Sequence, residues 1–337
     1  MAPPEIIFGT GGFGFYEGSP FNTPEKVQAA FDILQKHGTT RIDTARRYPN
    51  QNSGTCEQLL GQPTITPSPS RQKYGPCSTA THPPNSKRAS TSPSTSCTSP
   101  TLTPPTSTTP TSEPPSKTSA AASTTSTSRT NFPNSGISNF TIPQIKQILQ
   151  ICEENSYIKP VIYQGQYNAL ARDAEHELLP LLRKHDIAFY AYSPGAGGFF
   201  NGVDSTRLTA QDQTGDFTRG MYGGAGGAVE KVNQAAIRHG LTGHAAALRW
   251  VLHHSVLDAE RGDAVVIGAR TLEQLEETLR TCEMGPLPEE MVGVVDGVWG
   301  AVKDTAPLYS MFAKREGEGE NAMDRMLKKE SDCCEEM

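Results

Sequence analysis

Residues 41–49 read Arg-Ile-Asp-Thr-Ala-Arg-Arg-Tyr-Pro, and residues 50–61 continue as Asn-Gln-Asn-Ser-Gly-Thr-Cys-Glu-Gln-Leu-Leu-Gly. The first part is typical of a short strand that ends at Asp43, and the second favours a helix that begins near Thr55. Tyr48 therefore falls on the loop between strand and helix. This order predicts the rim of a parallel β/α barrel, where functional side chains gather at the carboxyl ends of strands.

The composition of the 337-residue chain limits the classes of partner. A hydrophobic content of 35% and a mean hydropathy of -0.48 are low for one compact domain, so part of the chain lies outside any core. The net charge of -6, with scattered lysines and arginines, argues against nucleic acid or an anionic membrane and favours a small soluble ligand.

The cysteines and the apolar runs bear on compartment and on metal binding. Seven cysteines form no metal-ligand spacing, so no metal site is expected and the thiols are expected to be reduced. The sequence shows no hydrophobic N-terminal signal and no apolar run of about 18 residues, which favours a cytoplasmic protein without a membrane span.

Strand and helix signals alternate along most of the chain. The first helix is expected to open at Thr23-Pro24 and to end at Gly38, with one apolar face formed by Val27, Ala30, Phe31 and Leu34. Strand signals are followed by helix signals in six places. The first is a strand that runs into a flexible turn within residues 5–14, and the other strands are predicted near residues 41–43, 136–140, 160–165, 187–194 and 264–270. The helices after the fourth and fifth strands are expected at residues 175–186 and 228–254, and a helix near residue 272 follows the sixth. A closed barrel has eight such units, so two are unaccounted for.

The two missing units coincide with residues 63–135, of which 49 of 73 are serine, threonine or proline. Such a segment buries too little apolar surface to offset its ordering entropy, which makes a disordered linker one interpretation. An out-of-frame translation is the other, and we favour it. Codons for Ser, Thr, Pro and Ala mostly have C in the middle position, so a gene rich in third-position C yields this composition when it is read out of register. The expected organisation is residues 1–62 and 136–312 as the two parts of the barrel, 63–135 as the low-complexity segment, and 313–337 as a charged disordered tail.

An aspartate on a strand end, five residues before a tyrosine on the next loop, suits carbonyl reduction. The tyrosine would donate a proton to the carbonyl oxygen, while the buried carboxylate would help to hold the proton near neutral pH. A second interpretation of the same residues is structural, with Asp43 capping a turn and Tyr48 packing on the surface.

The wider string Asp-Thr-Ala-x-x-Tyr, followed by Ser-Gly-Thr-x-Glu-x-Leu-Leu-Gly, closely resembles the active-site loop of aldo-keto reductases, especially the aflatoxin-aldehyde reductase branch. The resemblance covers residues 5–62 and 136–312. It implies a TIM barrel, NADPH as cofactor, a small-molecule carbonyl substrate and a role in secondary metabolism. It also implies a catalytic tetrad, whose aspartate and tyrosine match Asp43 and Tyr48. No residue aligns with the lysine or histidine of the tetrad, so a non-catalytic remnant is the alternative.

The resemblance also implies the cofactor contacts. The carboxamide of the nicotinamide would contact the strand-end groups Ser138, Asn139 and Gln164. The nicotinamide ring would stack on Tyr192, and the cofactor would also contact the next two residues, Ser193 and Pro194. The adenosine phosphate would meet a loop that runs into a helix N-terminus, represented by Gly268, Arg270, Gln274 and Glu277. Arg270 is the candidate contact for the 2′-phosphate. Ala269 and Thr278 depart from the serine and asparagine that the family commonly has at these places.

Overall fold

The computed structural model describes residues 2–62, 136–201 and 221–310. Six parallel strands form one sheet in the order β2-β1-β6-β5-β4-β3. The strands are β1 (Glu5–Gly9), β2 (Arg41–Asp43), β3 (Gly136–Ser138), β4 (Ile162–Gln166), β5 (Ala188–Tyr192) and β6 (Ala264–Ile267). The two parts of the chain meet where β1 pairs with β6.

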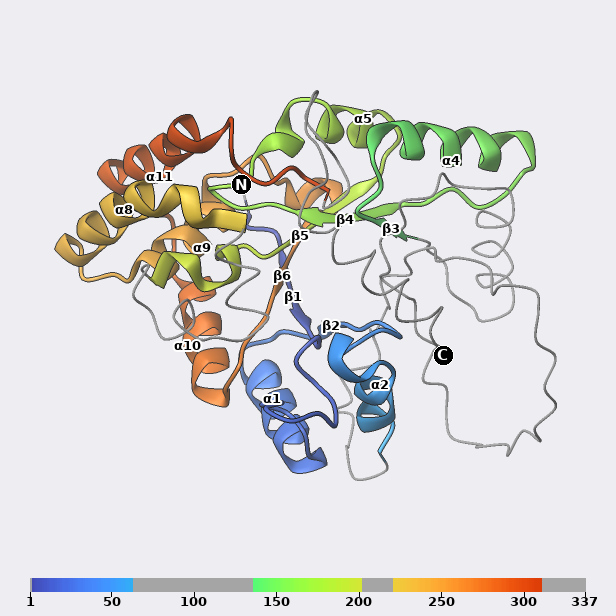
Figure 1. Cartoon of the computed structure of the whole chain (residues 1–337), viewed down its shortest axis with the longest axis horizontal. Helices are drawn as coiled ribbons and strands as arrows, with labels where there is room; N and C mark the ends of the chain where they lie inside the picture. The colour runs from blue at the N-terminus through green and yellow to red at the C-terminus, as the bar shows by residue number, and fades with distance from the viewer. Residues whose placement is uncertain (1, 63–135, 202–220, 311–337) are drawn as a thin grey trace, which may run out of the picture.

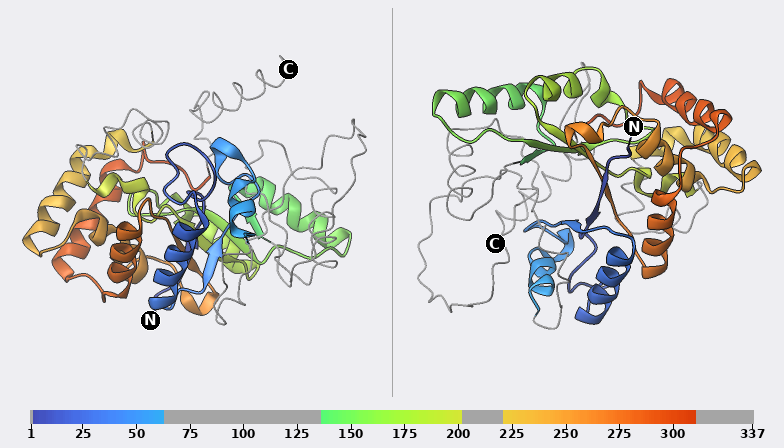
Figure 2. Two further views of the ribbon diagram at one scale, coloured as in Figure 1. Left: turned by 90° about the horizontal axis from the view of Figure 1, so that it is seen from below. Right: turned by 180° about the vertical axis from the view of Figure 1, so that it is seen from behind.

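Helices follow the strands and line the outer side of the curved sheet (Figure 1). The α-helices are α1 (Pro24–Lys36), α2 (Thr55–Leu60), α4 (Ile142–Glu154), α5 (Leu178–Lys184), α8 (Gly226–Arg238), α9 (Gly243–His253), α10 (Leu272–Glu283) and α11 (Glu289–Val302). Short 3-10 helices occur at η1 (Asn50–Asn52), η3 (Asp173–Glu175), η4 (Ala196–Asn201), η5 (Gly223–Ala225) and η6 (Ala259–Arg261). The two further views in Figure 2 show the same arrangement, with α1 and α2 beside β1 and β2 and with α4 and α5 beside β3 and β4.

Helix α1 follows its sequence signals closely. The Thr23 hydroxyl accepts a hydrogen bond from the Lys26 amide, and Pro24 occupies the first turn, where its missing N–H costs nothing. The four residues expected on its apolar face are the ones buried in the structure. The expected helix at residues 175–186 is shorter in the structure, because η3 ends at Glu175 and α5 covers only Leu178–Lys184.

The helical region expected at residues 228–254 is two helices, which corrects the sequence prediction. Gly240 takes a left-handed backbone conformation with φ 68° and ends α8, and Thr242 then caps α9 by accepting from the Ala245 amide. Helix α11 was not predicted at all. The segments 63–135 and 313–337, for which a linker or frame disruption and a tail were expected, lie outside the described residues.

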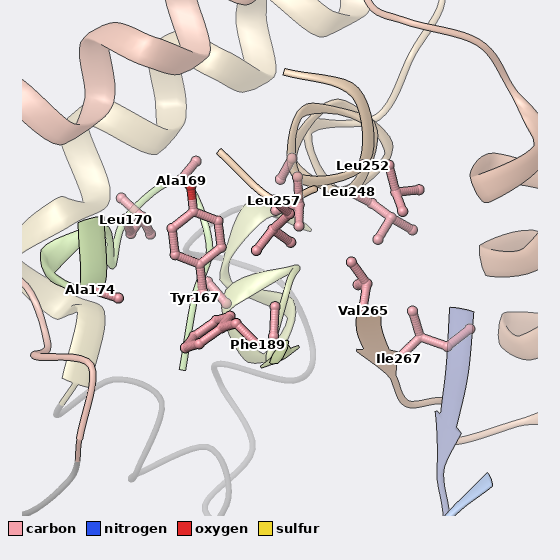
Figure 3. Packing of buried hydrophobic residues seen from close by; sticks show 14 of the residues in the cluster. Tyr167, Ala169, Leu170, Ala174, Phe189, Leu248, Leu252, Leu257, Val265 and Ile267 are labelled. Atoms are coloured by element: carbon pink, nitrogen blue, oxygen red, sulfur yellow. The ribbon is translucent and has the colours of Figure 1, made fainter. Parts of the chain in front are cut away.

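Alternation along the strands separates an outer core from a barrel interior. On the outer face, Val265 of β6 lies toward Leu248 and Leu252 of α9, and Phe189 of β5 lies beside Tyr167 (Figure 3). The opposite face forms a smaller interior cluster of Ile7, Ile162, Tyr190, Ala264 and Val266. Polar side chains follow this interior face toward the carboxyl ends of the strands.

A close contact on the outer face fixes β4 against its neighbours. The rings of Tyr163 and Phe189 are stacked, with centroids 5.9 Å apart, and both are fully buried. A Cβ atom at Gly165 would lie 2.7 Å from the Tyr163 ring and 2.9 Å from the Phe189 ring, so only glycine fits there. The Tyr163 hydroxyl donates to the Phe140 carbonyl at 2.8 Å, which ties β4 to the chain after β3.

Candidate active site

Asp43 is the buried centre of the polar group at the strand ends. Its side chain is 3% exposed, and its two carboxyl oxygens accept from Tyr48 Oη and from Gln164 Nε2, each at 3.1 Å. The Asp43 carbonyl accepts from the amide and the hydroxyl of Thr10, at 2.9 and 2.8 Å. These bonds join β2 to the ends of β1 and β4. Burial raises the pKa of the Asp43 carboxyl from 3.8 to about 6, against the lowering effect of the hydrogen bonds from Gln164 and Tyr48.

The backbone of Tyr48 is held in place by hydrogen bonds within its own loop. Its amide donates to the Ala45 carbonyl at 2.9 Å, and its carbonyl accepts from the amides of Gly54 and Cys56. A Cβ at Gly11 would lie 3.7 Å from the ring, so the loop after β1 forms one wall. The predicted closeness of Asp43 and Tyr48 is therefore found, with the hydroxyl directed at the carboxylate.

Ser138, Asn139 and Tyr192 form a second connected group. Asn139 takes a left-handed conformation with φ 60°, which asparagine tolerates better than most residues. Its Oδ1 accepts from the Tyr192 hydroxyl at 2.7 Å, its Nδ2 donates to Ser138 Oγ at 2.9 Å, and its carbonyl accepts from Ser310 Oγ at 2.5 Å. Burial raises the pKa of Tyr192, so its hydroxyl stays protonated at neutral pH. The structure thus brings these three predicted residues together.

Ser193 and Pro194 begin the turn that follows β5. Ser193 has φ 57°, and its carbonyl accepts from the Ala196 amide at 2.9 Å and from Asn168 Nδ2 at 3.0 Å. The next residue, Gly195, lies against the His244 ring, where a Cβ would come within 2.3 Å of Cε1. The turn is therefore fixed between β4 and α9.

Gly268, Arg270, Gln274 and Glu277 lie between β6 and the first turns of α10. Thr271 caps this helix by accepting from the Gln274 amide at 3.1 Å, and Gln274 Oε1 accepts from the Arg270 amide at 3.0 Å. Burial raises the pKa of the Tyr16 hydroxyl, and the positive charge of Arg270 offsets part of this rise. A Cβ at Gly268 would meet nothing within 4 Å, so the backbone is open to a ligand there.

The donor set fits a nicotinamide dinucleotide. Asn139, Gln164 and Ser138 supply the neutral donors and acceptors that a carboxamide needs, beside the Tyr192 ring. Arg270 and the N-terminus of α10 supply positive charge for a phosphate, and Gly268 leaves space.

Five residues around this group were not predicted: Thr10, Gln166, Asn168, Tyr222 and Ser310. Gln166 had a signal, because it lies two residues beyond Gln164 and therefore on the same face of the strand. Tyr222 and Ser310 come from segments without a strand pattern, so sequence spacing could not place them.

Residues 2–62, 136–201 and 221–310 contain no cluster of three His, Cys, Asp or Glu side chains suited to a metal ion. The same ranges contain no helix long and apolar enough to cross a bilayer. Cytoplasmic location remains a prediction.

This parallel α/β fold, with a tyrosine and a carboxylate at the strand ends beside a set of amides, is that of a β/α barrel whose polar site lies at the carboxyl ends of the strands. The family model "Aldo/keto reductase family" matches residues 133–300. Oxidoreductase SirO of Leptosphaeria maculans is 32% identical over 331 residues, which cover 91% of this chain and 97% of that protein. The chain belongs to the aldo/keto reductase family, whose members are NADP-dependent oxidoreductases.

Other relatives match over part of the chain. An aldo-keto reductase of Pseudocercospora fijiensis is 40% identical over 191 residues, which cover 53% of this chain and 64% of that protein. Aflatoxin B1 aldehyde reductase member 2 of Mus musculus is 36% identical over 197 residues, which cover 53% of each. The chain thus matches between half and two thirds of the length of these two relatives, and the resemblance to the aflatoxin-aldehyde reductase branch is confirmed.

Solved structures agree with the fold. A glycerol dehydrogenase of Gluconobacter oxydans has a TM-score of 0.60 and 16% identity, with 94% of each chain covered. An aldo-keto reductase of Klebsiella pneumoniae, in complex with NADPH, has a TM-score of 0.57 and 16% identity, with 90% of this chain and 92% of that chain covered. The expected barrel architecture is confirmed for the six described strands.

Proposed function

We propose that the protein is an NADPH-dependent reductase that converts an aldehyde or ketone into an alcohol, with Tyr48 as the proton donor. The contact between the Tyr48 hydroxyl and the Asp43 carboxylate, at the strand ends of an aldo/keto reductase, is the observation that carries this proposal. NADPH supplies the hydride when bound. The proposal includes a role in secondary-metabolite biosynthesis, which the resemblance to the aflatoxin-aldehyde branch supports.

The residues of the chain would orient the reactants and handle the proton. Asn139, Gln164 and Ser138 would hold the carboxamide of the cofactor, and Tyr192 would support the ring. Arg270, Gln274 and Glu277 would lie at the adenosine end. The two amides are neutral and are already held by neighbours, Asn139 by Ser138 and Tyr192 and Gln164 by Asp43, so they need little reorganisation to hold a ligand.

Tyr48 would give its proton to the carbonyl oxygen, and the developing charge on Tyr48 would be relieved by reprotonation. Asp43 is in direct contact with this hydroxyl, and burial raises the pKa of its carboxyl to about 6, so a minority of the carboxyl groups is protonated at neutral pH and can supply this proton. Asp43 would thereby return a proton to Tyr48 between turnovers.

The test is Tyr48→Phe, with Tyr157→Phe as a matched control on the half-buried loop after α4. Removing the Tyr48 hydroxyl should abolish NADPH oxidation with an aldehyde panel, while fluorescence titration should find nearly unchanged NADPH affinity. Equal loss of cofactor affinity and turnover would assign Tyr48 a structural role.

A non-catalytic remnant is the second candidate. Among the described residues Asp43 has only neutral hydrogen-bond partners, and no lysine or histidine there aligns with those of the tetrad. Saturable NADPH binding to the purified wild-type protein, without oxidation by any aldehyde or ketone of the panel, would favour this candidate.

A further inference from the structure

A polar cluster beside the proposed site takes no part in the chemistry described above. Tyr222, which precedes η5, is 4% exposed, and its phenol oxygen accepts from Gln166 Nε2 and, at 3.1 Å, from Asn168 Nδ2. Gln166 is 2% exposed and Asn168 is fully buried. A cluster this deeply buried must satisfy its polar atoms or lose free energy for each one left over.

The donors and acceptors of this cluster do not balance within the described residues. A tyrosine hydroxyl offers one donor in addition to its acceptor capacity. Two amides already occupy the acceptor side at Tyr222, and the described residues provide no acceptor for its proton. Gln166 directs Nε2 to Tyr222 and to Met221 Sδ, whereas its Oε1 has no donor in the described part of the chain. Asn168 is satisfied, because its Oδ1 accepts from the Leu170 amide.

The cluster lies next to the residues assigned to the cofactor and substrate. Gln166 pairs with Tyr192 across β4 and β5, and it follows Gln164 on the interior face. Two residues along a strand span roughly 6.6 Å, so Gln166 lies one layer beyond the Gln164 side chain that contacts Asp43. Tyr222 also lies close enough to Tyr192 to oppose its ionisation.

We propose that Tyr222 and Gln166 form a recognition site for a neutral hydroxyl group of the bound ligand. The Tyr222 hydroxyl donates to the ligand oxygen, and Gln166 Oε1 accepts the hydrogen bond from the ligand hydroxyl. A hydroxyl matches this pair because it both donates and accepts. An anion does not match it, because the groups that contact Tyr222 and Gln166 are amides and a thioether, and an unpaired buried charge is costly.

This inference rests on the proposed reductase function and narrows its substrate class to carbonyl compounds that carry a second, hydroxyl oxygen. A ribose hydroxyl of NADPH has the same chemistry and is the other source. Burial raises the pKa of Tyr222 to about 12, so the donor is present throughout the working pH range.

The experiment compares 4-(hydroxymethyl)benzaldehyde, whose alcohol stays neutral, with the isosteric 4-ethylbenzaldehyde in wild type, Tyr222→Phe and the control Tyr157→Phe. Wild type and the control should favour the hydroxyl compound in kcat/KM by about ten-fold, the size expected for one neutral hydrogen bond. In Tyr222→Phe the preference should fall to about one, with unchanged NADPH affinity. A preserved preference with about ten-fold weaker NADPH binding would also support the hydroxyl site and assign it to the ribose.

Unchanged preference and unchanged NADPH affinity in Tyr222→Phe would overturn the inference. If circular dichroism shows that this variant does not fold, Gln166→Met removes the acceptor side and is judged by the same two measurements. If wild type reduces neither aldehyde, the result counts against the proposed reductase function and leaves the hydroxyl site to be decided by binding. Calorimetric binding of the two aldehydes to the NADPH-loaded protein, together with the NADPH titrations, then decides the hydroxyl site by the same criteria.

Discussion

Replacing Asp43 with asparagine should stabilise the folded protein at neutral pH. The carboxyl is buried against Tyr48 and Gln164, which donate hydrogen bonds but carry no charge. Burial raises its pKa from 3.8 to about 6, so between these values the folded state binds more protons than the unfolded state. Stability present at acid pH is therefore lost as the pH rises through this window. At roughly 1.36 kcal/mol per pH unit, the ionised carboxylate costs the fold about 3 kcal/mol.

Urea unfolding of wild type and Asp43→Asn at intervals from pH 4 to pH 8 measures this cost. The free energy of unfolding of the variant, minus that of wild type, should increase by about 2.4 kcal/mol between pH 4 and pH 7 and then stay level, because the unfolded carboxyl is already more than half ionised at pH 4. Asp304→Asn, which removes the same charge from an exposed position after α11, is the control and should show no such step.

A difference that does not vary with pH would refute the reasoning, and so would one of opposite sign. A wild type that gains stability relative to Asp43→Asn as the pH rises would mean that a cation pairs with the carboxylate in solution and depresses its pKa. The measurement thus also tests whether the chain supplies the cation that the aldo-keto reductase resemblance implies.

Three further predictions concern the residues around the site. Arg270→Ala should lower the preference for NADPH over NADH by about ten-fold or more, measured as the ratio of kcat/KM values, because a charge-assisted contact to the 2′-phosphate is lost. Gly165→Ala should lower the free energy of unfolding by about 1 to 3 kcal/mol in urea, since a methyl group would overlap two buried rings, whereas Gly297→Ala, in open space on α11, should raise it by about 0.5 to 1 kcal/mol. Ser310→Ala should weaken NADPH binding several-fold by releasing the Asn139 carbonyl, and Ser310→Thr should restore it; equal affinity in all three proteins would refute that role.

The parts of the fold that sequence predicted are those with a clear period or cap. The apolar face of α1 and its Thr23 cap could be assigned because spacing and capping agree. The break between α8 and α9 was missed although Gly240 and Thr242 are stop and start signals, because α9 is buried on all sides and no polar stripe marks its register. Helix α11 carried a usable signal that was missed, because Met291, Val295, Val298 and Val302 recur at helical spacing.

In the candidate site, too, local contacts could be predicted from the sequence and long-range contacts could not. Asp43 and Tyr48 are five residues apart, so the geometry of one strand and one loop sufficed to bring them together. The bond from Gln164 to Asp43 spans 121 positions and depends on the strand order, which local pattern does not contain. Tyr222 is brought to the site by tertiary contacts, among them the Phe199 ring, with centroids 5.8 Å apart, and the hydrogen bond from Asn168.

The hydrogen bond from Ser310 to the Asn139 carbonyl has a consequence for biosynthesis, because the two residues are 171 positions apart. A ribosome adds roughly 5–20 residues each second, so about 9 to 34 seconds separate the synthesis of Asn139 from that of Ser310. During this interval the left-handed turn at Asn139 lacks its outer clamp. A nascent chain can therefore assemble much of its sheet before it reaches full cofactor affinity, and release of the final turns, rather than sheet formation, would set when NADPH first binds at full strength.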